Sequence, residues 1–248
     1  MGISREHHVV LTSTQDRAKE IVKNLNALTW QVVTADAQSN GRGTQGRVWI
    51  SPPEVNLYVT FVLPLPIDKK ALLIHFPQII AYSVLGTLKQ YGLQPKLKWV
   101  NDVLLNRKKV SGVLCETETA SKLQEHCFIL AGIGINVNMD KRGCEDVEPP
   151  TTSLMLELGH FVDKEDLLEK LTNEVVFNVN KLTENGFSYF VDKIIENLEF
   201  LGEKITLQLD DEKRTLKEGV LKGINRDGML LLKCGNDFEQ LFSGRILL

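Results

Sequence analysis

The fold is decided by residues 96–118, whose sequence is KLKWVNDVLLNRKKVSGVLCETE. Three segments of this stretch, residues 96–100, 103–105 and 110–118, are rich in Val and Leu and predict β-strands. Asn101-Asp102 and Asn106-Arg107 separate the segments, and both pairs are typical of tight turns. The stretch therefore predicts three consecutive strands of an antiparallel meander.

Further elements are predicted on the N-terminal side of the meander and directly after it. Strands are predicted at residues 8–12, 30–35, 56–63 and 128–137. Ser13 or Thr14 can cap a first helix, and residues 71–91 predict a second helix, which Pro77 should kink or delay. Residues 36–53 are polar and rich in glycine, so they predict a loop.

The pattern changes after Pro149-Pro150. Helices are predicted at residues 154–158, 164–182 and 187–198, and short strands at residues 204–209, 216–224, 229–232 and 238–241. Turns are predicted at Asp210-Asp211 and Asp227-Gly228. The order of elements predicts an α+β fold, with a mixed β-sheet flanked by helices in residues 1–200 and a small β-barrel in residues 201–248.

Composition restricts the function classes. The chain has 248 residues, enough for a full core, and is 43% hydrophobic and 25% charged, as is ordinary for a soluble enzyme. A net charge of −3 gives no overall positive charge with which the chain could bind nucleic acid or a membrane surface nonspecifically. No stretch reaches the roughly 18 apolar residues that a membrane-spanning helix needs, and residues 1–8 lack an apolar signal core. The four cysteines show no paired or metal-type spacing, so we expect reduced thiols and a cytoplasmic location.

Residues 41–49, GRGTQGRVW, combine three glycines and two arginines in one predicted loop. The stretch fits the dinucleotide-binding pattern G-x-G-x-x-G and nearly fits a P-loop, but both motifs require a helix directly after the loop. Pro52-Pro53 argues against such a helix. What remains is anion binding, because glycines let backbone N–H groups approach an anion and Arg42 and Arg47 add planar cations. A solvated surface turn is the alternative.

The meander carries a second charged group of residues. Its hairpin can bring Lys98 near Lys109, and two lysines between a carboxylate and a phosphate would offset their repulsion and stabilise the transition state. Asp102 can hold Mg²⁺ or orient a lysine, while a solvated lysine pair and a turn acid are the alternatives. With the glycine-rich loop, the group predicts a site for a triphosphate.

Glycines and tryptophans near these segments suggest contact with a ligand. Gly132 and Gly134 lie in an apolar predicted strand, where glycine marks close approach by a ligand or another backbone. Trp49 and Trp99 border the two basic segments, and each can cover a ring-shaped ligand or pack in the core.

These motifs, in this order, make the chain resemble the biotin–protein ligases, also called biotin–acetyl-CoA-carboxylase ligases. The resemblance covers nearly the whole chain and is carried by Ser13-Thr14, Gln38, Gly41 to Trp49, Asn56-Leu57-Tyr58, Lys98-Trp99, Asn101-Asp102, Lys109, Gly112, Gly134-Ile135-Asn136 and Thr152-Ser153-Leu154. It implies a sheet like that of class II aminoacyl-tRNA synthetases and an SH3-like C-terminal barrel. Because the ligase region starts by His8, it also implies a short form without an N-terminal helix-turn-helix domain.

The resemblance implies a two-step reaction that uses ATP, Mg²⁺ and biotin. The biotin carboxylate attacks the α-phosphorus of ATP and gives biotinyl-AMP and pyrophosphate. A lysine of the biotin carboxyl carrier protein then attacks the mixed anhydride. The implied partners are biotin and this carrier protein, without nucleic acid or membrane, and the chain is expected to be a monomer or a homodimer.

The resemblance also implies roles for individual residues. The implied biotin-binding residues are Ser13, Thr14, Gln38, Gly41, Arg42, Gly43, Lys109, Gly112 and Gly134. The implied ATP-binding residues are Arg47, Trp49, Lys98, Asn101, Asp102 and Asn136. Lys109 and Arg42 are the expected catalytic residues, and Asp102 is the expected contact to the Mg²⁺ that accompanies ATP.

Some positions depart from the family pattern. Thr44 stands where the family often has arginine, which predicts weaker retention of biotinyl-AMP. Val100 replaces a frequent proline, and Arg245 stands where the family often has the glutamate of a glycine–glutamate pair, so the role of the barrel in binding ATP or carrier is open.

Two alternative functions compete with the biotin–protein ligase. A lipoate–protein ligase or octanoyltransferase shares the fold, but its Arg-Arg-x-Ser-Gly-Gly-Gly type of loop is missing. A non-catalytic biotin- or nucleotide-binding regulator is the other alternative, and the presence of Lys109 and Arg42 argues against it.

Overall fold

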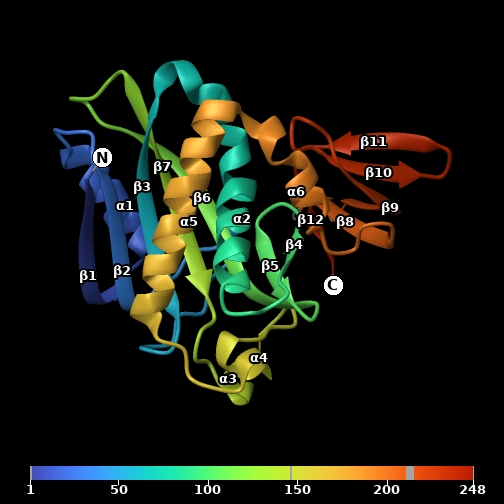
Figure 1. Ribbon diagram of the computed structural model, residues 1–248, viewed down its shortest axis with the longest axis horizontal. Helices are drawn as coiled ribbons and strands as arrows, with labels where there is room; N and C mark the ends of the chain where they lie inside the picture. Colours follow the sequence, from blue (N-terminus) through green and yellow to red (C-terminus); the bar gives the residue numbers. More distant parts are fainter. Residues whose placement is uncertain (1, 146, 211–214, 248) are drawn as a thin grey trace.

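The main β-sheet of the computed structural model, which describes residues 2–145, 147–210 and 215–247, has seven strands (Figure 1). Their order in the sheet is β1-β2-β3-β7-β6-β5-β4. The strands are β1 (Ile3–Leu11), β2 (Trp30–Gln38), β3 (Leu57–Pro66), β4 (Lys96–Lys98), β5 (Asp102–Leu105), β6 (Lys108–Thr119) and β7 (His126–Ile135). The pair β1–β2 is parallel and the other pairs are antiparallel, so the predicted mixed sheet is confirmed.

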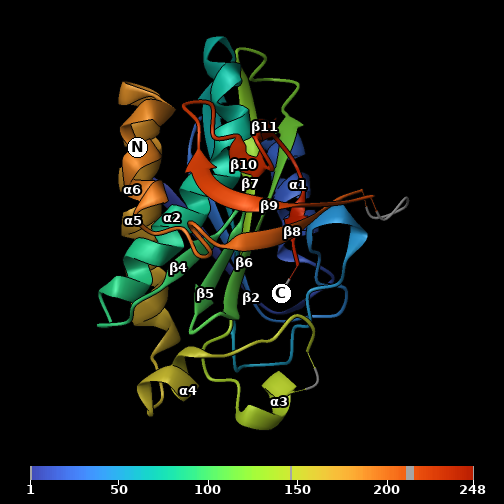
Figure 2. The ribbon, with the colours of Figure 1, turned by 90° about the vertical axis from the view of Figure 1, so that its right-hand side faces the viewer.

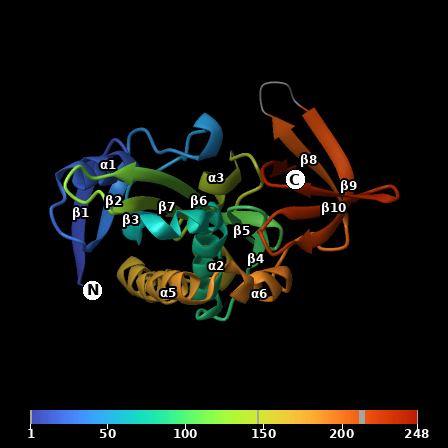
Figure 3. The same ribbon diagram turned by 90° about the horizontal axis from the view of Figure 1, so that it is seen from above.

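Helices cover both faces of this sheet. The α-helices are α1 (Thr14–Asn24), α2 (Phe76–Lys89), α3 (Lys141–Glu145), α4 (Leu154–Leu158), α5 (Lys164–Asn185) and α6 (Val191–Ile195), and the 3-10 turns are η1 (Thr44–Gly46), η2 (Ile67–His75) and η3 (Phe187–Tyr189). Figure 3 shows α1 on one face and α2 with α5 on the other. Successive side chains of a strand therefore point to opposite faces of the sheet: Val32 packs in the core under α2, and its neighbour Val33 packs under α1.

The segment Ile67–Lys89 is long and apolar enough, by length and composition, to cross a membrane. In the structure its α-helical part, α2, packs between the sheet and α5, and Ile80 and Val84 are fully buried. The apolar character of α2 therefore has an explanation in the core. Pro77 lies in the first turn of α2, which confirms the predicted delay of the helix.

The C-terminal residues form a second, five-stranded antiparallel sheet in the order β11-β10-β9-β8-β12. Its strands are β8 (Lys204–Asp210), β9 (Thr215–Ile224), β10 (Leu230–Cys234), β11 (Asp237–Leu241) and β12 (Arg245–Ile246). Within the described ranges the edge strands β11 and β12 do not pair, so the predicted SH3-like barrel is corrected to an open sheet. Asp211, in the turn predicted after β8, lies outside the described residues.

The second sheet packs beside the β4–β5 end of the main sheet (Figure 2, Figure 3). The carbonyl of Gly228 accepts hydrogen bonds from Gln78 Nε2 and Trp99 Nε1, each at 3.0 Å. Buried side chains of the C-terminal sheet, such as Leu207 and Leu232, belong to the same core cluster as those under α2. The C-terminal strands are thereby fixed against the meander, while the division at residue 200 stays a prediction.

Several boundaries differ from the predicted ones. β1 starts at Ile3, because it pairs with β2 along its whole length, and β2 continues through Gln38 into the predicted loop. β4 ends at Lys98, and Asp102 begins β5 instead of lying in the turn. The helix predicted at residues 187–198 is split into η3 and α6, and α3 was not predicted.

Candidate active site

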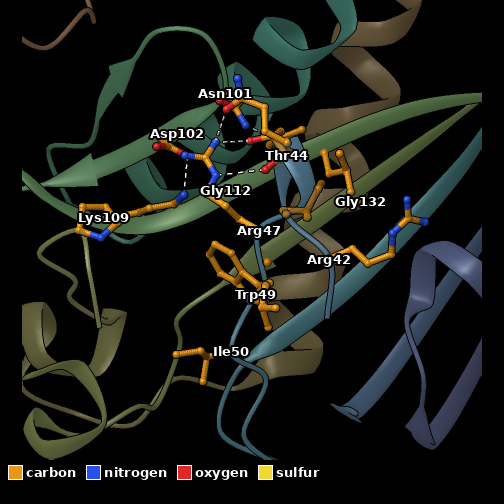
Figure 4. Close-up of a pocket in the computed structure, with 18 of the residues that line it drawn as sticks. Arg42, Thr44, Arg47, Trp49, Ile50, Asn101, Asp102, Lys109, Gly112 and Gly132 are labelled. Carbon is orange, nitrogen blue, oxygen red and sulfur yellow. Dashed lines mark hydrogen bonds and ion pairs between the residues drawn. The ribbon is translucent and has the colours of Figure 1, made fainter. Parts of the chain in front are cut away.

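A cavity of about 400 Å³, the size of a small-molecule site, opens beside the glycine-rich loop (Figure 4). The start of α1, residues 42–50, the turn after β4, strands β6 and β7, and the C-terminal sheet line it. All of the predicted site residues line this cavity except Gly41. The residues that the sequence marked as separate motifs therefore share one site.

Lys98, Asp102 and Lys109 form an ionic cluster on the cavity wall. The Asp102 carboxylate lies 2.6 Å from Lys109 Nζ through one oxygen and 3.2 Å from Lys98 Nζ through the other. Burial alone would raise the pKa of Asp102, but the two ammonium groups hold it below its ordinary value. Burial lowers the pKa of Lys98, and Asp102 opposes that shift. The predicted approach of the two lysines is thus confirmed.

The meander builds this cluster through its pairing. β4 and β5 place Lys98 opposite Asp102, and β5 and β6 place Asp102 opposite Gly112. A break in register after Val103 lets Lys109 reach back to the same carboxylate. Asn101 fixes the turn, since its side-chain amide donates to the carbonyl of Val113 at 2.6 Å.

Asp102 is poorly placed to bind a metal ion directly. Each of its carboxylate oxygens faces a lysine ammonium group, so the arrangement fits the orientation of lysines better than the coordination of Mg²⁺. In the part of the chain that the structure describes, no group of three His, Cys, Asp or Glu side chains could hold a metal.

The glycine-rich loop is closed on itself by its backbone. The N–H of Trp49 donates to the carbonyl of Gly41 at 2.9 Å, and the N–H of Gly43 donates to Arg47 at 2.8 Å. A Cβ on Gly41 would lie 2.3 Å from the Trp49 carbonyl oxygen, so the close approach of these two backbone segments requires glycine at position 41. No helix follows in residues 47–56, which agrees with setting aside the Rossmann and P-loop interpretations.

The two loop arginines have different surroundings. Arg47 Nη2 donates to Thr44 Oγ1 at 2.7 Å and to Gln45 Oε1 at 3.0 Å. Arg42 points away from Lys109 (Figure 4) and binds Asp16 and Glu116, each at 2.8 Å. The structure therefore does not bring Arg42, an expected catalytic residue, to the lysine cluster.

Hydrogen bonds organise the end of the cavity near α1. Ser13 caps α1 by accepting from the N–H of Gln15 at 3.2 Å. Gln38 Oε1 accepts from the backbone N–H of Thr14 at 2.9 Å and lies 3.2 Å from its hydroxyl, while Gln38 Nε2 donates to Ser51 at 2.9 Å. These bonds fix the positions of the predicted biotin-binding side chains.

Two residues behind this end were not predicted as site residues. Thr60 Oγ1 lies 2.9 Å from Thr14 Oγ1 and 3.1 Å from Gln15 Oε1. Gln15 Nε2 donates to the carbonyl of Leu130 at 3.0 Å, and a Cβ on Gly132 would lie 2.7 Å from Gln15 Oε1. Gly132 was the only signal in the sequence for this close packing.

Glycines on β6 and β7 form a floor for the Trp49 indole. Gly112 pairs directly with Gly134. A Cβ on Gly112 would lie 2.9 Å from the indole ring, and a Cβ on Gly134 would lie 2.4 Å from it. Lys109 Nζ lies 5.2 Å from the ring centroid, within range of a cation–π interaction. Trp49 Nε1 is buried and has no hydrogen-bond partner among the described residues. Trp99 belongs to the core cluster and also lines the cavity.

Asn136 lies at the end of β7, where it binds the segment after Pro150. Its side-chain amide donates to the carbonyl of Thr152 at 3.1 Å, and its own carbonyl accepts from the N–H of Leu154 at 3.0 Å. Asn136 is buried but lines the cavity, so it joins two walls of the site.

The profile of the Biotin/lipoate A/B protein ligase family matches residues 8–136. The chain belongs to this family. The biotin–[acetyl-CoA-carboxylase] ligase of Paracoccus denitrificans is 30% identical over 89% of this chain and 90% of its own length. The bifunctional ligase/repressor BirA of Bacillus subtilis (strain 168) is 29% identical over 99% of this chain and 74% of its own length.

A solved member of the family has the same fold. The biotin protein ligase from Aquifex aeolicus, determined in complex with biotin and ATP, superposes with a TM-score of 0.80 at 29% identity. The alignment covers 98% of this chain and 97% of that one. The predicted resemblance to biotin–protein ligases and the predicted fold class are therefore confirmed, except for the closed barrel.

Proposed function

We propose that this chain is an ATP-dependent biotin–protein ligase that forms biotinyl-AMP and transfers biotin to a lysine of a biotin carboxyl carrier protein. The observation that carries the proposal is the Lys98–Asp102–Lys109 cluster, which lies in a ligand-sized cavity of a chain from this family. Two ammonium groups fixed by one buried carboxylate are a preformed site for a phosphate that reacts with a carboxylate.

In the first step, an oxygen of the biotin carboxylate attacks the α-phosphorus of ATP, and the bond from this phosphorus to the bridging oxygen breaks as pyrophosphate leaves. Both reactants are anions, so a cation between them lowers the barrier. Lys109 fits this position because it lies between the Trp49 ring and Asp102. Asp102 keeps the ammonium group oriented, so little reorganisation is needed at the moment of reaction.

The two ends of the cavity suggest how biotin and ATP are arranged. Ser13, Thr14 and Gln38 offer hydroxyl and amide groups at the α1 end, which suits the polar ring of biotin. Lys98 lies at the opposite end, against the C-terminal sheet. We assign the remaining biotin contacts to the loop and floor residues Arg42, Gly43, Gly112 and Gly134, while Gly41 lets the loop close on itself. We assign the remaining ATP contacts to Arg47, Trp49, Asn101 and Asn136.

In the second step, the amine of the carrier lysine attacks the acyl carbon of biotinyl-AMP, an amide bond forms, and AMP leaves. The exposed loop over the cavity would shield the anhydride from water until the carrier arrives. The four cysteines are free thiols, which supports a reducing compartment, and we place the reaction in the cytoplasm.

The test is exchange of labelled pyrophosphate into ATP by the purified chain with Mg²⁺ and biotin, lipoate or octanoate. Exchange that depends on biotin alone is the expected result. Exchange that depends on lipoate or octanoate would keep the chemistry but overturn the substrate. No exchange with any of the three acids would overturn the assignment of the chain as an enzyme and would favour a non-catalytic binding protein.

A further inference from the structure

The C-terminal sheet contributes a cation to the cavity. Arg245, on β12, lines the cavity next to Gly244. Two contacts fix this strand, since Arg245 is the register partner of Gln208 on β8 and the Lys98 ammonium group donates to the carbonyl of Ile246 at 3.3 Å. Arg245 is therefore held at the Lys98 end of the cavity, away from the α1 end.

The cavity is positively charged although the chain carries a net charge of −3. Among the described residues that line it, the cations are Arg42, Arg47, Lys98, Lys109 and Arg245, and the anions are Asp102 and Glu148. Asp16 and Glu116 neutralise Arg42, and Arg245 adds a further cation at the end of the cavity where Lys98 lies. This end is complementary to a polyanion.

Arg245 and Lys98 are close enough to influence each other. Burial is the main cause of the lowered pKa of Lys98, and the positive charges of Lys109 and Arg245 lower it further. Like charges held together are unfavourable unless an anion joins them. An anion with several oxygens between Lys98 and Arg245 would remove this repulsion.

We propose that Arg245 binds the β- and γ-phosphates of ATP, the part that leaves as pyrophosphate. The inference rests on the proposed function, which puts the α-phosphate at Lys109. From Lys109 the rest of the triphosphate extends past Asp102 toward Lys98 and the C-terminal sheet. The guanidinium group suits this position, because its planar fork binds two phosphate oxygens at once. The C-terminal sheet thus takes part in adenylation.

The test compares Arg245→Gln, Arg245→Lys and the control Arg226→Gln with the parent. Arg226 is an exposed arginine of the same sheet, in the turn before β10, and does not line the cavity. Two reactions are measured: biotin-dependent pyrophosphate exchange, which gives the KM values of ATP, pyrophosphate and biotin, and transfer to carrier from supplied biotinyl-AMP. The second reaction contains no β- or γ-phosphate.

In Arg245→Gln we expect the KM values of ATP and pyrophosphate to rise at least about tenfold, with the KM of biotin and the transfer rate at the parental level. Arg226→Gln should match the parent. Unchanged KM values in Arg245→Gln, or equal losses in both reactions, would overturn the proposal. If Arg245→Gln does not fold, Arg245→Lys decides: a rise of about threefold in both KM values supports it, and parental values overturn it.

Failure of this inference is distinguishable from failure of the proposed function. A parent chain without biotin-dependent exchange would overturn both. A parent with normal exchange, whose KM values for ATP and pyrophosphate do not change in Arg245→Gln, would overturn only the role of Arg245.

Discussion

Replacement of Lys109 by methionine should abolish most of the adenylation activity and leave the fold intact. The change removes the ammonium group that lies 2.6 Å from Asp102 and keeps a side chain of similar length over Trp49. Asp102 retains its ion pair with Lys98 at 3.2 Å, so no carboxylate is left buried without a partner.

The expected magnitude follows from the position of the charge. Lys109 is largely shielded from solvent, with 19% of its side chain exposed, so water screens its charge only in part. Loss of one preorganised group of this kind raises a barrier by about 2.7–4 kcal/mol, or about 100- to 1,000-fold in rate. The pKa of Asp102 should rise at the same time, because Lys109 is its strongest positive neighbour.

The assay is the rate of biotin-dependent pyrophosphate exchange at saturating biotin and ATP. Lys108→Met is the matched control, because Lys108 is the exposed neighbour on β6 and does not line the cavity. Urea denaturation of both variants checks the fold. An exchange rate of Lys109→Met within about threefold of the parent, or an equal loss in Lys108→Met, would refute the reasoning.

Three further predictions test other parts of the site. Gly134→Ala should weaken biotin binding at least about tenfold in calorimetry, because its Cβ would lie 2.4 Å from the Trp49 ring; unchanged affinity would show that the indole can move freely. Thr44→Arg should slow the release of biotinyl-AMP about tenfold in a rapid-dilution assay, because it adds a cation to the loop; equal release rates would remove any role of this position in retention. Glu116→Gln should lower the free energy of unfolding in urea by about 1 kcal/mol at pH 7. Burial raises the pKa of Glu116, but Lys19 and Arg42 hold it below its ordinary value of 4.5. The contribution of the Glu116 carboxylate to the free energy of unfolding is therefore present above pH 4.5 and is lost as the pH falls below that value. The difference from the parent should shrink at pH 4, and a constant difference would contradict this assignment.

The local pattern of residues predicted most elements of the fold. Strand meanders and amphipathic helices follow from alternation and helical spacing, which report only which side of an element is buried. The hairpin turns between Lys98 and Lys109 lie close in sequence, so the ionic cluster around Asp102 followed from the same local pattern.

Contacts between distant segments could not be predicted. The ion pairs of Arg42 with Asp16 and Glu116 were not predicted, because only the folded sheet brings those carboxylates to the loop. The barrel was inferred from a run of short strands, but a run of strands does not say whether its edges meet. Arg245 stood out in the sequence only as a departure from the family pattern, and its position at the cavity could not be predicted because β12 has only two residues.

The most direct test of the proposed function is intact-mass analysis of a carrier domain incubated with the chain, ATP, Mg²⁺ and an equal mixture of biotin, lipoate and octanoate. The expected product carries one biotinyl group, on a single lysine, and forms only when ATP is present. A lipoyl or octanoyl product, or no product with a carrier that a known biotin ligase modifies, would contradict the proposed function.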